Sequence, residues 1–471
     1  MGLWVDEIHT LGPALHAKSL AEGLWHYVVL APTPPLYYYF MVFWSNLFGF
    51  EEWTLRLPSA IFGSLALGFF WFGLRRVYGT VFASMGTILM ALSWPAIYYS
   101  QEIRTYSILL MFTSGAAVTW MWILENRTSA RWPHVLTLWI FSFLASMSHP
   151  FGFLAAGFML LYAFVASLPN RPLSILVFLS GLALAALYGI WTAINLTGLG
   201  WVIGKSNMFT PPDSSFLIDV GAFLFHHPVV ALLTFGIPLL LGGRSYLKKL
   251  FSALGQRNLA APEIYLPFMI IVPFVVAFVA AQFKPFMYTR YLIVFLPFIY
   301  AFYALLMSSN SRFSPAVSQI VLACLAVLAT VWFIPDHYKV EKPQTREMAN
   351  YVLQNLQRGD VILTGCQPGP PFECAVGPGR NTDADWSKYL YYLNYKTLPE
   401  TPIVPQVFNS LFELDQLHTN YQKIGVKRVF FIGSRAGESY VFKALNHLQN
   451  KLGSCKSQQF HLATATICEI N

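Results

Sequence analysis

Two adjacent carboxylates, Asp6 and Glu7, stand in the N-terminal segment WVDE. A carboxylate beside a hydroxyl can act as a general base, which takes the proton as the oxygen attacks a substrate. Helix capping is the alternative, because Asp at an N-cap accepts backbone N–H bonds and Glu is favourable in a first turn. The spacing alone favours capping, so a catalytic role needs support from other motifs.

A second acidic motif, YYSQEIRTY at residues 98–106, places Glu102 and Arg104 between two apolar segments. Ionisable residues at membrane level are candidates for function, although these two could form a structural ion pair. Arg56 and Arg290 each begin another apolar segment, where an arginine often serves as an interfacial anchor. Carboxylates and arginines on one surface could together hold a phosphate and a nucleophile.

The motifs are embedded in a strongly apolar chain. Of its 471 residues, 56% are hydrophobic and 11% are charged, whereas a soluble protein is charged at about a quarter of its positions. The composition excludes a water-soluble protein and predicts a polytopic helical membrane protein. Residues 1–335 and 336–471 each contain 26 charged residues, so the shorter second part is predicted to be a soluble domain. Their net charges of +6 and +2 do not indicate a nucleic-acid partner.

Ten apolar segments are near the length that crosses a hydrocarbon layer of ~30 Å. They are residues 55–74, 80–99, 105–124, 133–148, 150–168, 173–194, 216–242, 264–282, 290–308 and 314–335. Two earlier segments, residues 7–24 and 35–49, are predicted to be interfacial helices of a first exterior loop, residues 1–54. His149 lies in the tight hairpin between the fourth and fifth spans, and we expect a turn or packing role for it rather than ligand binding.

Lysine and arginine residues concentrate in alternate loops, which indicates the cytoplasmic side. This set comprises Arg75, Arg76, Arg127, Arg131, Arg171, Arg244, Lys248, Lys249, Arg257 and Arg312. The acidic motifs and the C-terminal domain are therefore placed on the extracytoplasmic side. An even number of spans places Met1 there too, yet nothing in residues 1–10 resembles a signal peptide. We therefore expect a further transmembrane helix ahead of Met1.

The C-terminal part, residues 336–471, alternates helical and strand patterns. Helices are predicted near residues 345–357 and 411–424, and a β-rich run follows each of them, at 360–364 and 426–433. The pattern predicts a small α/β domain.

Four of the five cysteines lie in this C-terminal domain, as a disulfide-permissive exterior compartment would allow. Four cysteines permit three pairings. We favour the pairing of sequence neighbours, Cys366 with Cys374 and Cys455 with Cys468. A zinc site is less favoured, because no C-x-x-C spacing is present.

Several motifs occur in an order that resembles the GT-C glycosyltransferases. They are the early Asp-Glu pair, PPLYY, FG followed by LRLPSA, YSQExRxY, and a late RYLI followed by Pro297. The resemblance covers residues 4 to about 300 and is most specific in the first hundred. The closest group is the bacterial enzymes similar to lipopolysaccharide galacturonosyltransferases, related to the protein O-mannosyltransferases and the lipid A aminoarabinose transferase.

The resemblance implies a GT-C catalytic domain in residues 1–335 that takes a sugar from a polyprenyl-phosphate carrier on the outer face of the cytoplasmic membrane. Asp6 matches the family's catalytic carboxylate and Glu7 its neighbour, and Glu102 is a further catalytic candidate. We expect an inverting reaction with Asp6 as general base, a role that contributes roughly 100- to 10,000-fold in rate. The acceptor would be a hydroxyl of a glycolipid, a glycan or a protein, and membrane lipids would surround the enzyme.

Negative charge develops on the departing lipid phosphate, and charged hydrogen-bond donors can stabilise it. The candidates for binding the lipid phosphate and substrate are Arg56, Arg104, Tyr106, Arg290 and Tyr291. A divalent cation, Mg²⁺ or Mn²⁺, bound by Asp6 and Glu102 could serve the same purpose, because hard cations prefer oxygen ligands. Metal dependence varies among the related enzymes.

A transporter or a lipid-carrier flippase without chemistry is the alternative function. Transporters often contain internal repeats and charges at the bilayer midplane. We find no repeat in this sequence, and its acidic motifs gather at one predicted surface, which favours an enzyme.

Overall fold

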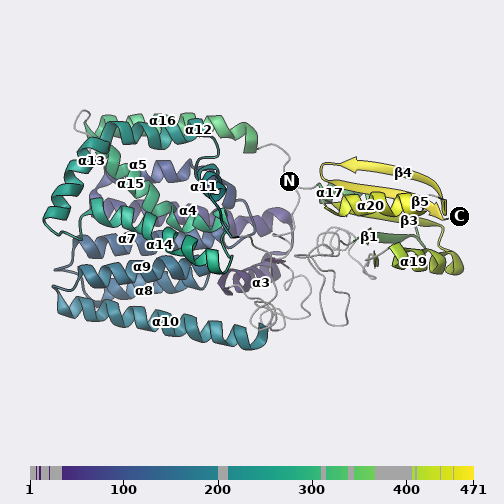
Figure 1. Ribbon diagram of the computed structural model, residues 1–471, viewed down its shortest axis with the longest axis horizontal. Helices are drawn as coiled ribbons and strands as arrows, with labels where there is room; N and C mark the ends of the chain where they lie inside the picture. Colours follow the sequence, from purple (N-terminus) through teal and green to yellow (C-terminus); the bar gives the residue numbers. More distant parts are fainter. Residues whose placement is uncertain are drawn as a thin grey trace.

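The computed structural model shows a bundle of long helices with a smaller α/β domain beside one end of it (Figure 1). It describes residues 7, 10, 11, 21, 34–199, 211–308, 314–337, 344–365, 406–408, 411–434, 436–448 and 450–470. The predicted fold class, a polytopic helical membrane protein with a small C-terminal α/β domain, is confirmed.

The bundle consists of α-helices with one π-helical segment, η1, and one 3₁₀ segment, η2. They are α3 (Leu36–Phe48), α4 (Glu52–Tyr78), α5 (Thr80–Ala91), α6 (Trp94–Tyr99), α7 (Tyr106–Glu125), α8 (Trp132–Ser146), α9 (Pro150–Ala166), α10 (Arg171–Leu199), α11 (Ser215–Phe225), α12 (Pro228–Ala231), η1 (Leu232–Gly236), α13 (Ile237–Gly255), α14 (Pro262–Phe283), η2 (Thr289–Phe295), α15 (Leu296–Ser308) and α16 (Pro315–His337).

Six helical runs in the described chain are long and apolar enough to cross a membrane. They are Glu52–Tyr78, Tyr106–Glu125, Arg171–Ile194, Pro228–Gly255, Pro262–Phe283 and Thr289–Ser308. The remaining predicted spans correspond to shorter apolar helices, such as α8 with 15 residues and α9 with 17. The predicted span 80–99 is divided, because Ser93 is extended and Pro95 lies in the first turn of a new helix, α6.

The predicted span 216–242 is wrong in its bounds. Helix α11 ends at Phe225, and His226 adopts a φ of 58°, in the left-handed region that non-glycine residues rarely occupy. The chain becomes helical again at Pro228 and remains so to Gly255, and this second run is the one able to cross the membrane. A hydropathy window averages apolar character and does not detect such a backbone break.

Helix α7 and the run from η2 through α15 form the centre of the bundle, since 83% of the most apolar window of each is buried. Trp120 of α7 is fully buried, and its ring contacts Tyr162, Tyr265 and Phe298. In α10, by contrast, only 22% of that window is buried, and several large apolar side chains are exposed. Lipid can cover these side chains without the free-energy cost of hydrating them.

A side-chain hydrogen bond that replaces a missing backbone one fixes helix α3 against the first turns of α4. Pro58 lies inside α4 and has no N–H to donate to the carbonyl of Thr54. The indole N–H of Trp44 in α3 donates to that carbonyl instead, at 2.9 Å. The bond satisfies a carbonyl that the proline leaves open, and it positions the α4 segment that contains Arg56 and Ser59.

The C-terminal domain is built on a five-stranded sheet with the order β2-β1-β3-β5-β4. Its elements are α17 (Thr345–Asn355), β1 (Val361–Gly365), β2 (Gln406–Phe408), α19 (Leu411–Ile424), β3 (Arg428–Ser434), α20 (Ala436–Leu448), β4 (Leu452–Phe460) and β5 (Ala463–Ile470). Strand β1 is parallel to β2 and β3, whereas β5 is antiparallel to β3 and β4. The helices predicted near 345–357 and 411–424 and the strands after them are confirmed.

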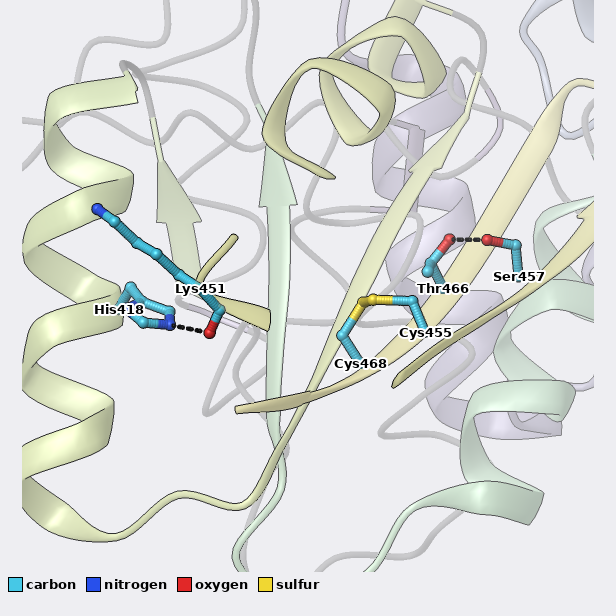
Figure 2. The surroundings of a disulfide bond; sticks show 6 residues. All are labelled: His418, Lys451, Cys455, Ser457, Thr466 and Cys468. Carbon is cyan, nitrogen blue, oxygen red and sulfur yellow. Dashed lines mark hydrogen bonds between the residues drawn. A yellow bond between two sulfur atoms is a disulfide. The ribbon is translucent and has the colours of Figure 1, made fainter. Parts of the chain in front are cut away.

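A disulfide between Cys455 and Cys468 joins β4 to β5 (Figure 2). The two cysteines are directly opposite in the strand register, so the bond cross-links neighbouring strands. Beside it, the hydroxyls of Ser457 and Thr466 are hydrogen bonded at 2.8 Å. Cys366 and Cys374, the other pair expected from the sequence, lie outside the described residues.

Candidate active site

Glu7 is a fully buried carboxylate that connects three segments of the chain. Arg56 donates to its two oxygens, from Nε to Oε1 at 3.2 Å and from Nη2 to Oε2 at 3.0 Å. The backbone N–H of Ile103 donates to Oε1 at 3.1 Å. A forked guanidinium bond fixes the carboxylate in orientation as well as position. Glu7 and Arg56, two of the predicted site residues, are thus in direct contact, and Glu7 accepts hydrogen bonds from two separate segments.

The next turn of α4 fixes the same loop through Ser59. The Ser59 hydroxyl donates to the backbone carbonyl of Glu102 and is hydrogen bonded to the hydroxyl of Tyr37 at 3.0 Å. Residues three apart on a helix share a face. From that face Ser59 contacts residue 102 directly, and Arg56 is connected to Ile103 through Glu7. All three hydroxyl and carbonyl groups are buried, and the hydrogen bonds satisfy them.

The short loop between α6 and α7 presents Glu102 and Arg104. Glu102 is 2% exposed. The Arg104 guanidinium donates to the Thr10 hydroxyl at 3.2 Å and lies 5.8 Å from the centre of the Tyr106 ring. Thr105 donates to the carbonyl of Ser148 at 2.7 Å, which fixes this loop to the hairpin between α8 and α9. The loop and the hairpin therefore share one end of the bundle.

A cluster of four aromatic rings, Tyr99, Tyr106, His149 and Tyr291, connects the two remaining arginines. The ring centre of His149 is 4.5 Å from that of Tyr291 and 6.0 Å from that of Tyr106. Tyr106 is in turn 4.7 Å from Tyr99. Arg290, at the start of η2, lies 4.7 Å from the centre of the Tyr288 ring and 6.0 Å from that of Tyr291. The structure thus places Arg104 and Arg290 at the margins of one aromatic cluster.

His149 is the N-cap of α9, and its ring Nδ1 accepts a hydrogen bond from the N–H of Phe151 at 3.2 Å. It lies between α8 and α9, outside both helices. Burial, together with the charges of Arg104 and Arg290, lowers the pKa of His149 to about 3. The ring is therefore neutral at physiological pH, with its hydrogen on Nε2. The expected turn role agrees with this position, although the ring also faces Tyr291.

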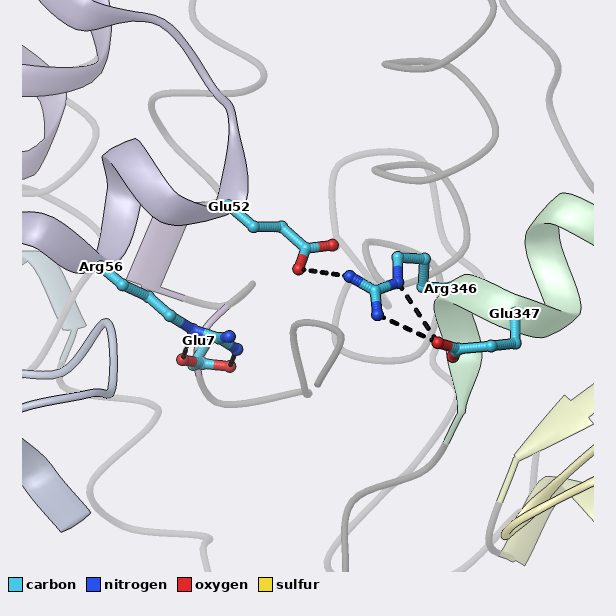
Figure 3. Close-up of polar contacts among 5 residues, drawn as sticks. All are labelled: Glu7, Glu52, Arg56, Arg346 and Glu347. Carbon is cyan, nitrogen blue, oxygen red and sulfur yellow. Dashed lines mark hydrogen bonds and ion pairs between the residues drawn. The ribbon is translucent and has the colours of Figure 1, made fainter. Parts of the chain in front are cut away.

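The C-terminal domain contacts the same first turn of α4 (Figure 3). Arg346 of α17 donates to Oε2 of Glu52 at 3.0 Å and also to Oε1 of Glu347 at 3.1 Å. Glu52 and Arg56 are four residues apart on α4, the spacing at which Glu and Arg favour an ion pair within a helix. With Arg346 bound to Glu52, we expect that carboxylate to compete less for the Arg56 fork that holds Glu7. Sequence reasoning does not identify this contact, because 294 residues separate its partners.

The predicted metal ligands are not assembled in the described part of the chain. Asp6 lies outside the described residues, and Glu102 is the one predicted ligand that the structure describes. Within the described ranges, no group of three or more His, Cys, Asp or Glu side chains could hold a metal ion. The oxygens of Glu7 already accept from Arg56 and Ile103, which makes Glu7 a poor substitute ligand.

The chain has detectable similarity to one protein family and to several solved structures. Residues 32–191, which include Arg56, Glu102 and Arg104, match the family model of dolichyl-phosphate-mannose-protein mannosyltransferase. No protein of curated function matches the sequence.

Among solved structures, the chain is similar to ArnT from Cupriavidus metallidurans. The apo structure has a TM-score of 0.62 at 14% identity, over 99% of this chain and 93% of that chain. The structure bound to undecaprenyl phosphate has a TM-score of 0.62 at 13% identity, over 99% of this chain and 94% of that chain. At this identity the likeness is one of fold, and the fold expected from the sequence motifs is confirmed.

The competition between Arg346 and Arg56 for Glu52 predicts a specific pattern of amide exchange at Ile103. Arg346→Ala should free Glu52 to approach Arg56, loosen Glu7, and speed exchange of the Ile103 amide about fivefold, equivalent to ~1 kcal/mol. Adding Glu52→Gln should restore slow exchange, because the competitor is then gone. The measurement is hydrogen exchange by mass spectrometry on peptides that contain Ile103.

The matched control is Arg358→Ala, an exposed arginine of the same domain, which should leave exchange at Ile103 unchanged. Equal exchange in Arg346→Ala and in the double variant would mean that Arg346 acts only by docking the domain.

His149 predicts an acid-sensitive contribution to stability. Its folded-state pKa of about 3 lies below its ordinary value, so the unfolded chain takes up the proton first. The contribution of neutral His149 to the free energy of unfolding is fully present above about pH 6.5. It is lost as the pH falls toward 3, by up to ~1.4 kcal/mol per pH unit. The melting temperature of His149→Gln should therefore fall less than that of the wild type between pH 6.5 and 4.5. Parallel curves for the two proteins would contradict this, and the exposed His461→Gln should follow the wild type.

Proposed function

We propose that this chain, a member of the GT-C superfamily of membrane glycosyltransferases by its fold and its family-model match, transfers a sugar from a polyprenyl-phosphate carrier to an acceptor hydroxyl. One observation carries the proposal. Carboxylate and arginine motifs from distant parts of the sequence converge on one end of the bundle, where Arg104 and Arg290 border a buried aromatic cluster. That arrangement suits an anionic phosphate next to a sugar.

In the proposed reaction the acceptor oxygen attacks the anomeric carbon from the face opposite the phosphate, so the configuration inverts. The bond between the anomeric carbon and the phosphate oxygen breaks, and its electron pair leaves with the phosphate. Asp6 takes the proton from the acceptor hydroxyl. Glu7, the next residue in the chain, is fixed by Arg56 and Ile103, which supports the assignment of Asp6 to this site.

The guanidinium groups of Arg104 and Arg290 would stabilise the charge that develops on the departing phosphate. A site with little access to water strengthens such interactions, because the effective dielectric constant is low. Tyr106 and Tyr291 pack against these arginines, and Tyr291, which is partly exposed, would form part of the wall along which the first part of the prenyl chain lies. A divalent cation, Mg²⁺ or Mn²⁺, would be held by Asp6 and Glu102 and would neutralise phosphate charge when bound.

We further propose that the site faces the exterior of the cytoplasmic membrane. Arg127, one of the arginines expected in the cytoplasm, lies at the other end of the bundle. Its guanidinium donates to the carbonyl of Ala166, and its backbone carbonyl accepts from the side-chain amide of Asn170. Arg76 lies over the ring of Trp122 at that end. Cationic loops at one end and an α/β domain with a disulfide at the other fit this orientation. The acceptor would be a glycolipid, a glycan or a protein on that side.

Asp6→Asn should abolish sugar transfer while the protein stays folded and still binds polyprenyl phosphate. The amide is nearly the same size as the carboxylate but cannot take a proton, so a loss of roughly 100-fold or more is expected. The assay follows cleavage of a radiolabelled polyprenyl-phosphate sugar, with Glu469→Gln in the C-terminal sheet as control. Wild-type turnover in Asp6→Asn would refute the base assignment, and lipid translocation without cleavage in the native protein would establish a flippase.

Arg104→Ala and Arg290→Ala should each weaken binding of undecaprenyl phosphate roughly 10- to 100-fold, the value of a hydrogen bond to a charged group. A thermal-shift titration with the lipid measures the effect. Arg244→Ala, an exposed arginine on α13, is the matched control and should bind as tightly as the wild type. Unchanged affinity in both site variants would place the phosphate elsewhere.

A further inference from the structure

A cavity of about 600 Å³ lies between the start of α11 and the residues that lead into η2. Phe216, Asp219 and Phe223 of α11 line one side, and Tyr288 and Thr289 line the other. The segment ahead of α11 is held in place by the side-chain amide of Gln282 in α14, which donates to the carbonyl of Pro212 at 2.7 Å. The volume of the cavity is sufficient for a monosaccharide.

The cavity adjoins the candidate active site directly. Tyr288 lines the cavity, and the centre of its ring lies 4.7 Å from the guanidinium carbon of Arg290. On the other side, the Phe223 ring is 6.2 Å from that of Tyr99, a member of the aromatic cluster. A group attached to a phosphate at Arg290 would therefore lie close to the opening of this cavity.

The lining combines aromatic rings, a threonine hydroxyl and two carboxylates, and it contains no lysine, arginine or histidine among the described residues. Asp213 accepts from the N–H and hydroxyl of Ser215 at 2.8 and 2.6 Å, and these bonds lower its pKa. Asp213 therefore mainly shapes the start of α11. It also adds negative charge to the cavity.

Asp219 has a different setting. It is the single charged residue of α11, whose sequence is SFLIDVGAFLF, and it faces the cavity. Within the described structure it has no hydrogen bond or ion pair that would explain a carboxylate at this position. A charged group in an otherwise apolar segment at the membrane is a candidate for function.

We propose that this cavity binds the sugar of the lipid-linked donor, and that this sugar bears hydroxyl or amine groups and no carboxylate. The inference rests on the proposed function and specifies its substrate class. Hydroxyl and ammonium groups donate hydrogen bonds to Asp219, and sugar C–H faces pack on Phe216, Phe223 and Tyr288. A hexuronic acid would bring a third carboxylate into a cavity that already has two.

This differs from the substrate expected for the lipopolysaccharide galacturonosyltransferases, a group that the sequence motifs resemble. Like charges at close range disfavour binding, and a cavity lined by one sign of charge concentrates ligands of the opposite sign. Asp219 is then a specificity-determining residue, distinct from the phosphate-binding arginines.

The test uses the full-length chain in lipid nanodiscs with four probes: polyprenyl phosphate alone, and the same lipid phosphate linked to glucose, to an amino sugar or to galacturonic acid. Wild-type protein should bind the glucose and amino-sugar lipids about tenfold or more tightly than the galacturonic acid lipid. Asp219→Asn should reduce this preference, and Asp219→Lys should reverse it in favour of galacturonic acid. Glu469→Lys makes the same charge change in the C-terminal sheet and should leave the preference intact.

Equal or tighter binding of the galacturonic acid lipid by the wild type would overturn the inference, as would an unchanged preference in Asp219→Lys. If Asp219 variants change only the KM for the acceptor, the cavity serves the acceptor and the donor assignment is wrong. If bare polyprenyl phosphate binds but the three sugar lipids bind with equal affinity, this inference is refuted and the proposed function is not. Failure of every lipid phosphate to bind would refute both.

Discussion

Glu7 is a carboxylate without exposed surface, and its hydrogen bonds join the N-terminal segment, the first turns of α4 and the loop after α6. A buried charge is tolerated only where charged partners and hydrogen bonds compensate for lost hydration. Removal of one partner from a fully buried pair costs about 3–5 kcal/mol, and less here because 22% of the Arg56 side chain is exposed. The positions of Arg56 and of the backbone at Ile103 are fixed by satisfying this one group.

The remaining contacts reinforce that arrangement from separate directions. Trp44 completes the backbone of α4 where Pro58 interrupts it, and Ser59 then fixes the carbonyl of Glu102. Arg346 binds Glu52 from the C-terminal domain and leaves the Arg56 fork to Glu7. An ion pair therefore joins the domain to α4, and we expect the domain to influence the neighbouring pair of Arg56 with Glu7.

The motif positions predicted that Glu7, Arg56, Glu102, Arg104 and Arg290 share one end of the bundle, because helix ends on the same side of alternating spans lie together. The contact of Glu7 with Arg56 and the aromatic setting of Arg290 needed the folded chain, since hydropathy says nothing of side-chain partners. The break at His226 is likewise a feature of backbone conformation, which an average over apolar residues cannot reveal. The role of Glu52 depends on a domain that no local pattern connects with α4.

We propose that a lipid phosphate binds between Arg104 and Arg290, with Asp6 as the general base. An electron cryo-microscopy structure of the full-length chain in a lipid nanodisc with undecaprenyl phosphate tests it directly. We predict phosphate density within hydrogen-bond distance of both guanidinium groups, with the prenyl chain against Tyr291. Phosphate density at the opposite end of the bundle, near Arg127 and Arg131, would contradict it.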